Sequence, residues 1–168
     1  RLDRNKSTDN ARLILALTAI GKDVTDVGGY DLLAGLDDIK YVKRQGTNGP
    51  VWTLIALDSH DYTPAGSVTR DALVETILSL QKDNGAWYIN STNTTDDVDM
   101  TAMAIQALAP YYETNEAVKA AVDKALTWLS TMQKSDGSFA EMAGAASSSE
   151  STAQVLAALC ALGIDPTA

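Results

Sequence analysis

The octapeptide LQKDNGAW at residues 80–87 returns at residues 132–139 as MQKSDGSF. A second pair follows, because DMTAMAIQAL at 99–108 matches ESTAQVLAAL at 150–159. The chain therefore contains a repeated unit of about fifty residues, arranged as helix, glycine–aromatic turn, loop and helix. The turn places a glutamine, a lysine, a glycine and an aromatic residue at matching positions, which are Gln81 and Gln133, Lys82 and Lys134, Gly85 and Gly137, and Trp87 and Phe139.

A third copy of the second helix lies near the start of the chain. The stretch STDNARLILALTAIGKD at 7–23 parallels SESTAQVLAALCALGID at 149–165, with serine, alanine, leucine, glycine and aspartate at matching positions. Helical hairpins of this kind stack side by side, because one hairpin cannot bury its apolar face alone. We therefore expect a stack of hairpins along most of the chain.

Apolar residues recur with helical spacing in each repeat. In TRDALVETILSLQK at 69–82, for example, Leu73, Ile77 and Leu80 fall on one helical stripe. No segment alternates convincingly with the period of a strand, so the sequence predicts an all-α fold. We expect Gly85 and Gly137 to end their helices. The predicted helices cover residues 8–21, 30–44, 50–58, 69–82, 98–112, 115–134 and 150–162.

The composition is that of an acidic globular protein. The 168 residues carry a formal net charge of −9, so we expect no nucleic-acid partner, since a phosphate backbone requires a concentrated positive face. No apolar run approaches the roughly 20 residues that span a bilayer. The length suits a single domain over residues 1–168. The opening RLDRNKSTDN lacks a signal-peptide pattern, and its abrupt start predicts a fragment of a larger protein.

Two residue types that often carry chemistry occur only once. Cys160 lies in the apolar stretch AQVLAALCALG, where we expect a buried small side chain. His60 lies in a turn between two predicted helices. One cysteine and one histidine do not make an ordinary zinc site, and we expect no cofactor.

The pattern Gln-x-x-x-Gly-x-Trp resembles the QW repeat of squalene and terpenoid cyclases. A weaker version, QGTNGPVW, places Gln45 and Gly49 with Trp52 one position late. The resemblance implies the α/α toroid of terpenoid cyclases and protein prenyltransferases, in which hairpins circle an axis; about seven helices would form a partial ring, about half of it. The resemblance also implies a structural repeat motif without catalytic function, made of Gln81, Gly85, Trp87, Gln133, Gly137 and Phe139.

Three longer stretches resemble the squalene-cyclase-like repeat region of bacterial cell-surface proteins that carry transcobalamin-like modules. These are NGPVWTLIALDS, DVDMTAMAIQALAPYY and SESTAQVLAALCALGID. The resemblance implies an extracellular or cell-surface location and a non-catalytic binding or scaffold module, with a small molecule or protein partner on a concave face. It also raises cobalamin as an alternative ligand, because the transcobalamin-like helix start is echoed by VDMTAMA at 98–104. Exposed end helices would permit self-association.

The stretch DVDMTA at 97–102 resembles the Asp-x-Asp-Asp-Thr-Ala motif of class II terpenoid cyclases, with Met100 in place of the last aspartate. If the chain is a fragment of such an enzyme, the resemblance makes Asp99 the general acid and Asp97 its neighbour. The alternative is helix capping. Asp96 and Asp99 have capping-box spacing, and Ser147 and Glu150 occupy the same places in the next repeat. We expect a helix cap and a chain that is not an enzyme.

A ligand-binding face is the third possibility for this helix start. Asp99, Met103 and Gln106 are spaced to share one side of the helix, and Glu150 and Gln154 are counterparts in the next repeat. The preceding loop, NSTNTTDD at 90–97, is also rich in oxygen ligands. With Asp96, Asp97 and Asp99 it is a weak calcium candidate, although it lacks the spacing of an EF-hand loop, and a solvated loop is the expectation.

Overall fold

A computed structural model describes residues 5–166 of the chain. The described residues contain seven α-helices and three short 3-10 helices, and no β-strand beyond isolated bridges. The prediction of an all-α fold is confirmed. The chain divides into two compact units between Ile77 and Leu78, within helix α4 (Arg70–Ser79).

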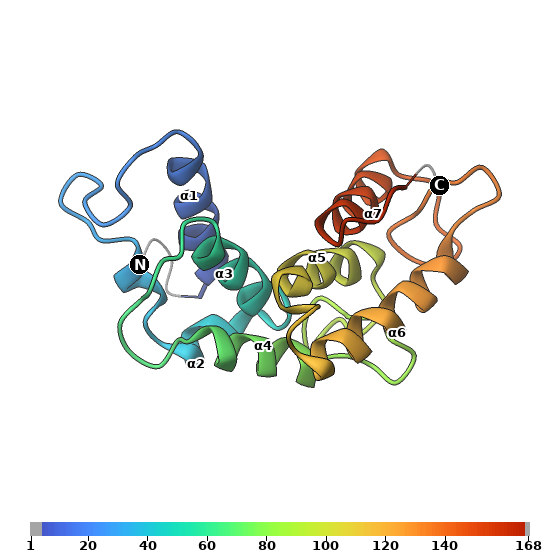
Figure 1. Cartoon of the computed structure of the whole chain (residues 1–168), viewed down its shortest axis with the longest axis horizontal. Coiled ribbons are helices and arrows are strands. Elements are labelled where there is room, and N and C mark those ends of the chain that lie inside the picture. The colour runs from blue at the N-terminus through green and yellow to red at the C-terminus, as the bar shows by residue number, and fades with distance from the viewer. Residues whose placement is uncertain (1–4, 167–168) are drawn as a thin grey trace. The chain divides into compact units, whose positions relative to one another are not determined.

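The first unit is built around helices α1 (Ser7–Ala19) and α3 (Asn48–Asp58), which pack side by side (Figure 1). Between them the chain forms η1 (Leu33–Leu36), α2 (Ile39–Val42) and η2 (Lys43–Gln45). The core of this unit consists of aliphatic side chains and one tyrosine with no exposed surface, among them Ile14, Leu36, Tyr41, Val42, Leu54 and Leu57.

The prediction of one continuous helix over residues 30–44 is wrong. Two aspartates interrupt it, because their carboxylates accept hydrogen bonds from backbone amides that a continuous helix would use internally. Asp31 accepts from Leu33 N at 2.8 Å, and Asp38 caps α2 by accepting from Lys40 N at 2.9 Å. The apolar residues of the segment instead lie on two short 3-10 helices, η1 and η2, and the single-turn helix α2.

Arg70, which the sequence did not single out, joins the end of α3 to the start of α4. Its guanidinium donates to Asp58 Oδ1 at 2.7 Å, to the Leu57 carbonyl at 2.9 Å and to the Tyr62 carbonyl at 3.0 Å. The last carbonyls of a helix lack partners within the helix, and the guanidinium satisfies one of them, Leu57, while Ser59 donates to the carbonyls of Ile55 and Ala56.

The second unit contains α5 (Val98–Leu108), η3 (Ala109–Tyr111), α6 (Glu116–Met132) and α7 (Ser149–Ala161). Helix α5 packs against both α6 and α7 (Figure 1). Nearly every side of α5 is therefore buried, whereas α7 buries only Ser151, Val155 and Ala158. Helix α6 is capped by Asn115, whose side chain accepts from the amides of the first turn.

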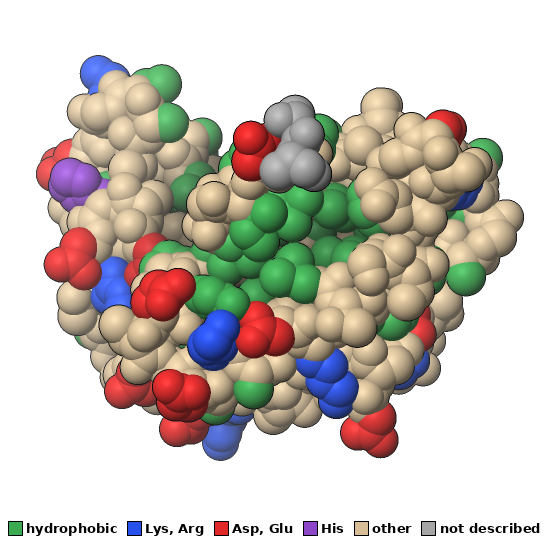
Figure 2. Space-filling view, turned by 45° about the vertical axis from the view of Figure 1, so that its right-hand side comes forward, with side chains coloured by type: hydrophobic (Ala, Val, Ile, Leu, Met, Phe, Trp, Pro, Cys, Tyr) green, Lys and Arg blue, Asp and Glu red, His purple; other side chains and the backbone are tan. Residues whose placement is uncertain are grey.

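The expectation of a buried Cys160 is wrong. Cys160 is exposed, because it lies away from the side of α7 that contacts α5. Leu156 on the same helix is also exposed. Figure 2 shows that hydrophobic side chains also reach the surface, among polar and charged ones. None of the helices in residues 5–166 is long and apolar enough to cross a membrane.

Candidate functional site

The first QW-type motif forms a tight turn after α4. Lys82 N donates to the Ala86 carbonyl at 2.9 Å, and Gly85 N donates to the Lys82 carbonyl at 2.9 Å. Gly85 has a φ of +98°, which side-chain-bearing residues rarely adopt. The prediction that Gly85 and Gly137 end their helices is wrong by several residues, because α4 ends at Ser79 and α6 at Met132. The glycines serve the turns that follow.

Gln81 connects this turn to the next helix. Its side-chain amide Nε2 donates to the Gly85 carbonyl at 3.0 Å and to the Ala121 carbonyl of α6 at 2.8 Å. The Gly85 backbone also lies close to α6, since a Cβ built on it would be 2.6 Å from the Lys124 carbonyl oxygen. Gln81 and Gly85 thus act together as a contact between repeats.

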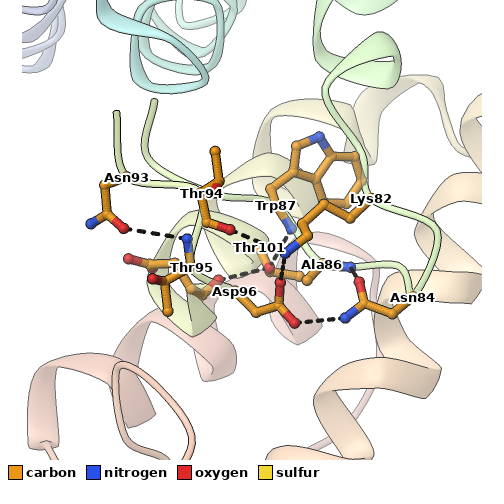
Figure 3. A network of polar contacts seen from close by, with 10 residues as sticks. Lys82, Asn84, Ala86, Trp87, Asn93, Thr94, Thr95, Asp96 and Thr101 are labelled. Carbon is orange, nitrogen blue, oxygen red and sulfur yellow. Dashed lines mark hydrogen bonds and ion pairs between the residues drawn. The ribbon is translucent and has the colours of Figure 1, made fainter. Parts of the chain in front are cut away.

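The aromatic residue of the motif is tied to the start of α5. Trp87, fully buried, forms a bridge with Asp97, in which Asp97 N donates to the Trp87 carbonyl at 3.1 Å. Trp87 N donates to Thr101 Oγ1 at 2.9 Å, and that hydroxyl donates to the Asp97 carbonyl at 2.7 Å (Figure 3). Thr101 therefore attaches the glycine–aromatic turn to the N-terminal end of α5.

The three aspartates around the start of α5, which are Asp96, Asp97 and Asp99, have separate structural roles. Asp97 is the N-cap of α5, with extended backbone, and its Oδ1 accepts from Met100 N at 2.8 Å. The prediction that Asp96 and Asp99 form the capping box is wrong by one position. Asp96 pairs instead with Lys82 and accepts from Asn84 at 2.6 Å (Figure 3). The N-cap is the last residue before the helix, which is Asp97, so Asp96 lies one position outside the cap and Asp99 is the second helical residue.

The second repeat reproduces the same arrangement around Phe139. Lys134 N donates to the Ser138 carbonyl at 2.9 Å, and Phe139 N donates to Thr152 Oγ1 at 3.0 Å. The N-cap of α7 is Ser148, which accepts from Ser151 N at 3.1 Å, so the assignment of the cap to Ser147 is also wrong by one position. Ser147 accepts from Lys134 Nζ at 3.1 Å, as Asp96 does from Lys82.

The electrostatics of the first repeat differ from those of the second because Asp97 is a buried carboxylate. Burial raises the pKa of Asp97, opposed by the hydrogen bond from Met100 N and supported by repulsion from Asp99 and Glu141. Asp99 Oδ1 is buried and has no hydrogen-bond partner in the structure. Chemically, this pair offers one protonatable cap and one buried carboxylate oxygen whose hydrogen-bonding capacity the described residues do not use.

The predicted ligand-binding residues lie on two adjacent helices. Gln106 of α5 donates from Nε2 to Gln154 Oε1 at 3.1 Å and to the Gln154 carbonyl at 3.3 Å, which joins the two helices directly. Met103 is buried. Glu150 is exposed. Its pKa is lowered mainly by a hydrogen bond from its own backbone amide, and further by hydrogen bonds from the hydroxyls of Ser149 and Ser148.

Two of the three calcium candidates are engaged in other contacts. Asp96 is engaged by Lys82 and Asn84, and Asp97 by the helix amide. Within residues 5–166, no group of three histidine, cysteine or acidic side chains is placed to hold a metal ion.

The weak third motif forms a different structure. Gln45 is the last residue of η2, while Gly49 and Trp52 lie inside α3. Gln45 Oε1 accepts from Thr8 N at 3.0 Å and so satisfies an amide at the start of α1, which has no cap side chain of its own. The interpretation of QGTNGPVW as a QW-type turn is therefore wrong, although its glutamine again joins neighbouring elements.

Comparison with known proteins identifies one family. The model of the prenyltransferase alpha-alpha toroid domain matches residues 32–167, which include both glycine–aromatic turns and helices α5 to α7. No curated protein and no solved structure gave a match. The repeated hairpins and the extent of this match show that the chain belongs to the prenyltransferase alpha-alpha toroid domain family.

Proposed function

We propose that the chain is a non-catalytic binding or scaffold module of an extracellular bacterial surface protein. The observation that carries the proposal is the equivalence of the two helix starts. Asp97 and Ser148 make the same capping hydrogen bond, and Asp96 and Ser147 accept from equivalent lysines. Because serine fills both places in the second repeat, helix capping by Asp97 and the lysine contact of Asp96 support structural roles for these two acidic groups.

The binding face of this proposal includes the starts of α5 and α7. Asp99 supplies a buried, unpartnered carboxylate oxygen, and the Gln106–Gln154 pair supplies amide groups between the same two helices. Such groups suit a ligand that brings a hydrogen-bond donor to Asp99. Cobalamin, whose side-chain amides are donors, is the alternative ligand that the transcobalamin-like resemblance raises. The surface location rests on the resemblance of the repeat sequences.

A fragment of a class II terpenoid cyclase is the second candidate. One observation bears on it: burial raises the pKa of Asp97, which is the neighbouring carboxylate of the motif and not the acid that the resemblance assigns. A general acid must hold a proton at the working pH and have access to the substrate. On this proposal Asp99 would donate the proton, and Asp97 would be its neighbour in the motif.

The experiment is a thermal-shift titration of the chain with cobalamin, with calcium and with a short isoprenoid panel, in parallel with product analysis of the isoprenoid incubations. Asp99→Asn is the test variant. Asp83→Asn is the matched control, because Asp83 is an exposed aspartate in the glycine–aromatic turn at residues 80–87. The binding proposal predicts a saturable rise in Tm that Asp99→Asn alone abolishes, with no cyclised product. Formation of a cyclised product that depends on Asp99 would replace it with the enzyme. The absence of any ligand response would leave a scaffold.

A further inference from the structure

The C-terminal ends of α1 and α3 border an open pocket of about 330 Å³ in the first unit, which we call the α1–α3 pocket. Its volume lies at the lower end of the range of small-molecule sites, about 300–1,000 Å³. No residue of the α5 and α7 helix starts belongs to it. The lining comes from the last turn of α1 and from the two segments that follow the helices, and it consists of Thr18, Gly21, Lys22, Asp23, His60 and Tyr62.

Both helices end in the same kind of tight turn, which fixes the backbone beneath the pocket. Lys22 N donates to a carbonyl of α1 at 2.9 Å across Gly21, whose φ is +67°. Tyr62 N donates to a carbonyl of α3 at 2.8 Å across Asp61, whose φ is +53°. This is the hydrogen bond of the Schellman motif, which follows a residue in the left-handed conformation. Lys22 and Tyr62 therefore leave their helices in equivalent positions, and both line the pocket.

Side-chain contacts join the two helix ends across the pocket. Thr18 Oγ1 and Tyr62 OH share a hydrogen bond of 2.9 Å, in which either hydroxyl can donate. Since only one of the two protons is used, the other has no acceptor among the described residues. The ring of His60 lies 5.3 Å from the ring of Tyr62, centroid to centroid, with 50° between the ring planes. The pocket thus combines aromatic surface with hydroxyl groups.

Charged groups of both signs complete the rim. Asp23 Oδ1 accepts from Thr25 Oγ1 at 2.7 Å and from Thr25 N at 2.8 Å, and these bonds lower the pKa of Asp23 and hold its carboxylate in place. Lys22 and His60 are exposed, and neither the ammonium nor the imidazole forms a hydrogen bond within residues 5–166. The opposite charges of Lys22 and Asp23 balance, so the pocket offers both donors and acceptors without favouring a charged ligand.

The polar lining is specific to this helix end and is not part of the repeat. Helix α7 aligns with α1 and also ends in a glycine turn, at Gly163, whose φ is +72°. Cys160 stands there in place of Thr18, and Ile164 in place of Lys22. The turn therefore forms equally well with apolar residues, and the polar groups of the α1–α3 pocket are not required for it.

We propose that the α1–α3 pocket binds a neutral sugar ring. A sugar ring has an apolar face of C–H groups, which packs on aromatic rings, and a rim of hydroxyls that both donate and accept hydrogen bonds. His60 and Tyr62 supply the aromatic surface, Lys22 supplies donors and Asp23 supplies acceptors. A hexose carries no charge, as the balanced rim requires. The inference is independent of any ligand at the starts of α5 and α7, because the two places share no residue.

The test is a titration of the isotope-labelled chain, followed by two-dimensional amide NMR spectra. The probes are glucose, galactose, mannose and N-acetylglucosamine, each free and as its methyl glycoside, which separates a free sugar from a sugar unit of a longer chain. Choline and acetate test whether charge alone is recognised. Lys22→Ile, which introduces the residue present at Ile164, and His60→Ala are the test variants. Lys40→Ile and Tyr30→Ala, at exposed residues outside the pocket, are the matched controls.

The proposal predicts saturable shifts of the amide signals of residues 18–23 and 60–62 with at least one sugar, at a Kd of about 1–10 mM, as expected for a small ligand in an open site. Lys22→Ile and His60→Ala should each weaken binding by about tenfold, and the two controls should leave it unchanged. The absence of shifts with every sugar would overturn the proposal, and so would equal weakening by the controls. Shifts at the pocket with choline or acetate alone would also overturn it, because they would identify a charged ligand.

Discussion

The two glycine–aromatic turns of this protein have the same hydrogen bonds and different surroundings. In each, a backbone amide of the aromatic residue donates to a threonine hydroxyl, at 2.9 Å for Trp87 and 3.0 Å for Phe139. Gly85 of the first turn is buried beneath α6, whereas Gly137 of the second is exposed. The motif therefore specifies the turn itself, and the neighbouring helix decides how much of the turn's stability depends on packing.

The glycines should show the largest difference between the two turns. Gly85→Ala should destabilise by about 3 kcal/mol or more, because a positive φ is combined with a clash against the Lys124 carbonyl. Gly137→Ala should cost only the strain of its φ of +84°, about 1–2 kcal/mol. Urea unfolding of each variant measures both values. Equal losses would show that α6 does not hold the first turn.

The threonines should show the next largest difference. Thr101 is fully buried, so Thr101→Val leaves the Trp87 amide without an acceptor and should cost about 1–3 kcal/mol. Thr152 is only partly buried, and water can replace its hydroxyl. Thr152→Val should therefore cost less than about 1 kcal/mol. Hydrogen exchange at the Trp87 and Phe139 amides, compared with urea unfolding, would reveal whether the loss is local. A larger cost at Thr152 would contradict the burial difference.

The glutamines test the contact between repeats. Gln81→Ala removes two hydrogen bonds, one of them to α6, and should destabilise by about 1–2 kcal/mol. Gln133→Ala removes a single exposed hydrogen bond and should change the free energy of unfolding by less than about 0.5 kcal/mol. Differential scanning calorimetry is sensitive enough to separate the two. If the variants proved equivalent, the bond to Ala121 would contribute nothing to stability.

The caps should differ least, and only in their pH dependence. The pKa of Asp97 is raised in the folded state, so folding binds a proton between the ordinary aspartate value of 3.8 and the higher folded value. Stability should therefore fall as pH rises through that interval. Asp97→Asn keeps a capping side chain and should remove the fall. Ser148→Asn, at the equivalent cap without a charge, should leave the pH profile of unfolding unchanged. A profile unaffected by Asp97→Asn would place the cause elsewhere.

Much of the architecture followed from local sequence pattern. The spacing of apolar residues predicted the helices, and the alignment of STDNARL with SESTAQV paired Ser7 with Ser149, which begin α1 and α7 one residue before the predicted starts. The break in the segment 30–44 was missed because the aspartates there compete for backbone amides, and apolar periodicity carries no record of that competition. Arg70 was missed because its three acceptors are 8 to 13 residues distant and belong to no pattern.

The candidate site was predictable in its residues and less so in their roles. The sequence predicted that DVDMTA at 97–102 belongs to the candidate site. The structure shows that Asp97 is the helix cap and that Asp96 pairs with a lysine. Which residue caps a helix depends on where the chain leaves the extended conformation, and the bridge between Trp87 and Asp97 sets that point. The Gln106–Gln154 bond was also beyond the sequence, since it requires two helices to be placed side by side.

The sequence by itself determined the repeat, the helical class and the chemistry of the turn, because these depend on residues close together in the chain. Only the tertiary structure decided that Gly85 is enclosed while Gly137 is open, that Cys160 is exposed, and that Leu156 is exposed where its counterpart Ile105 is buried. Burial depends on what packs against a surface from elsewhere, and two copies of one sequence pattern can therefore have opposite environments.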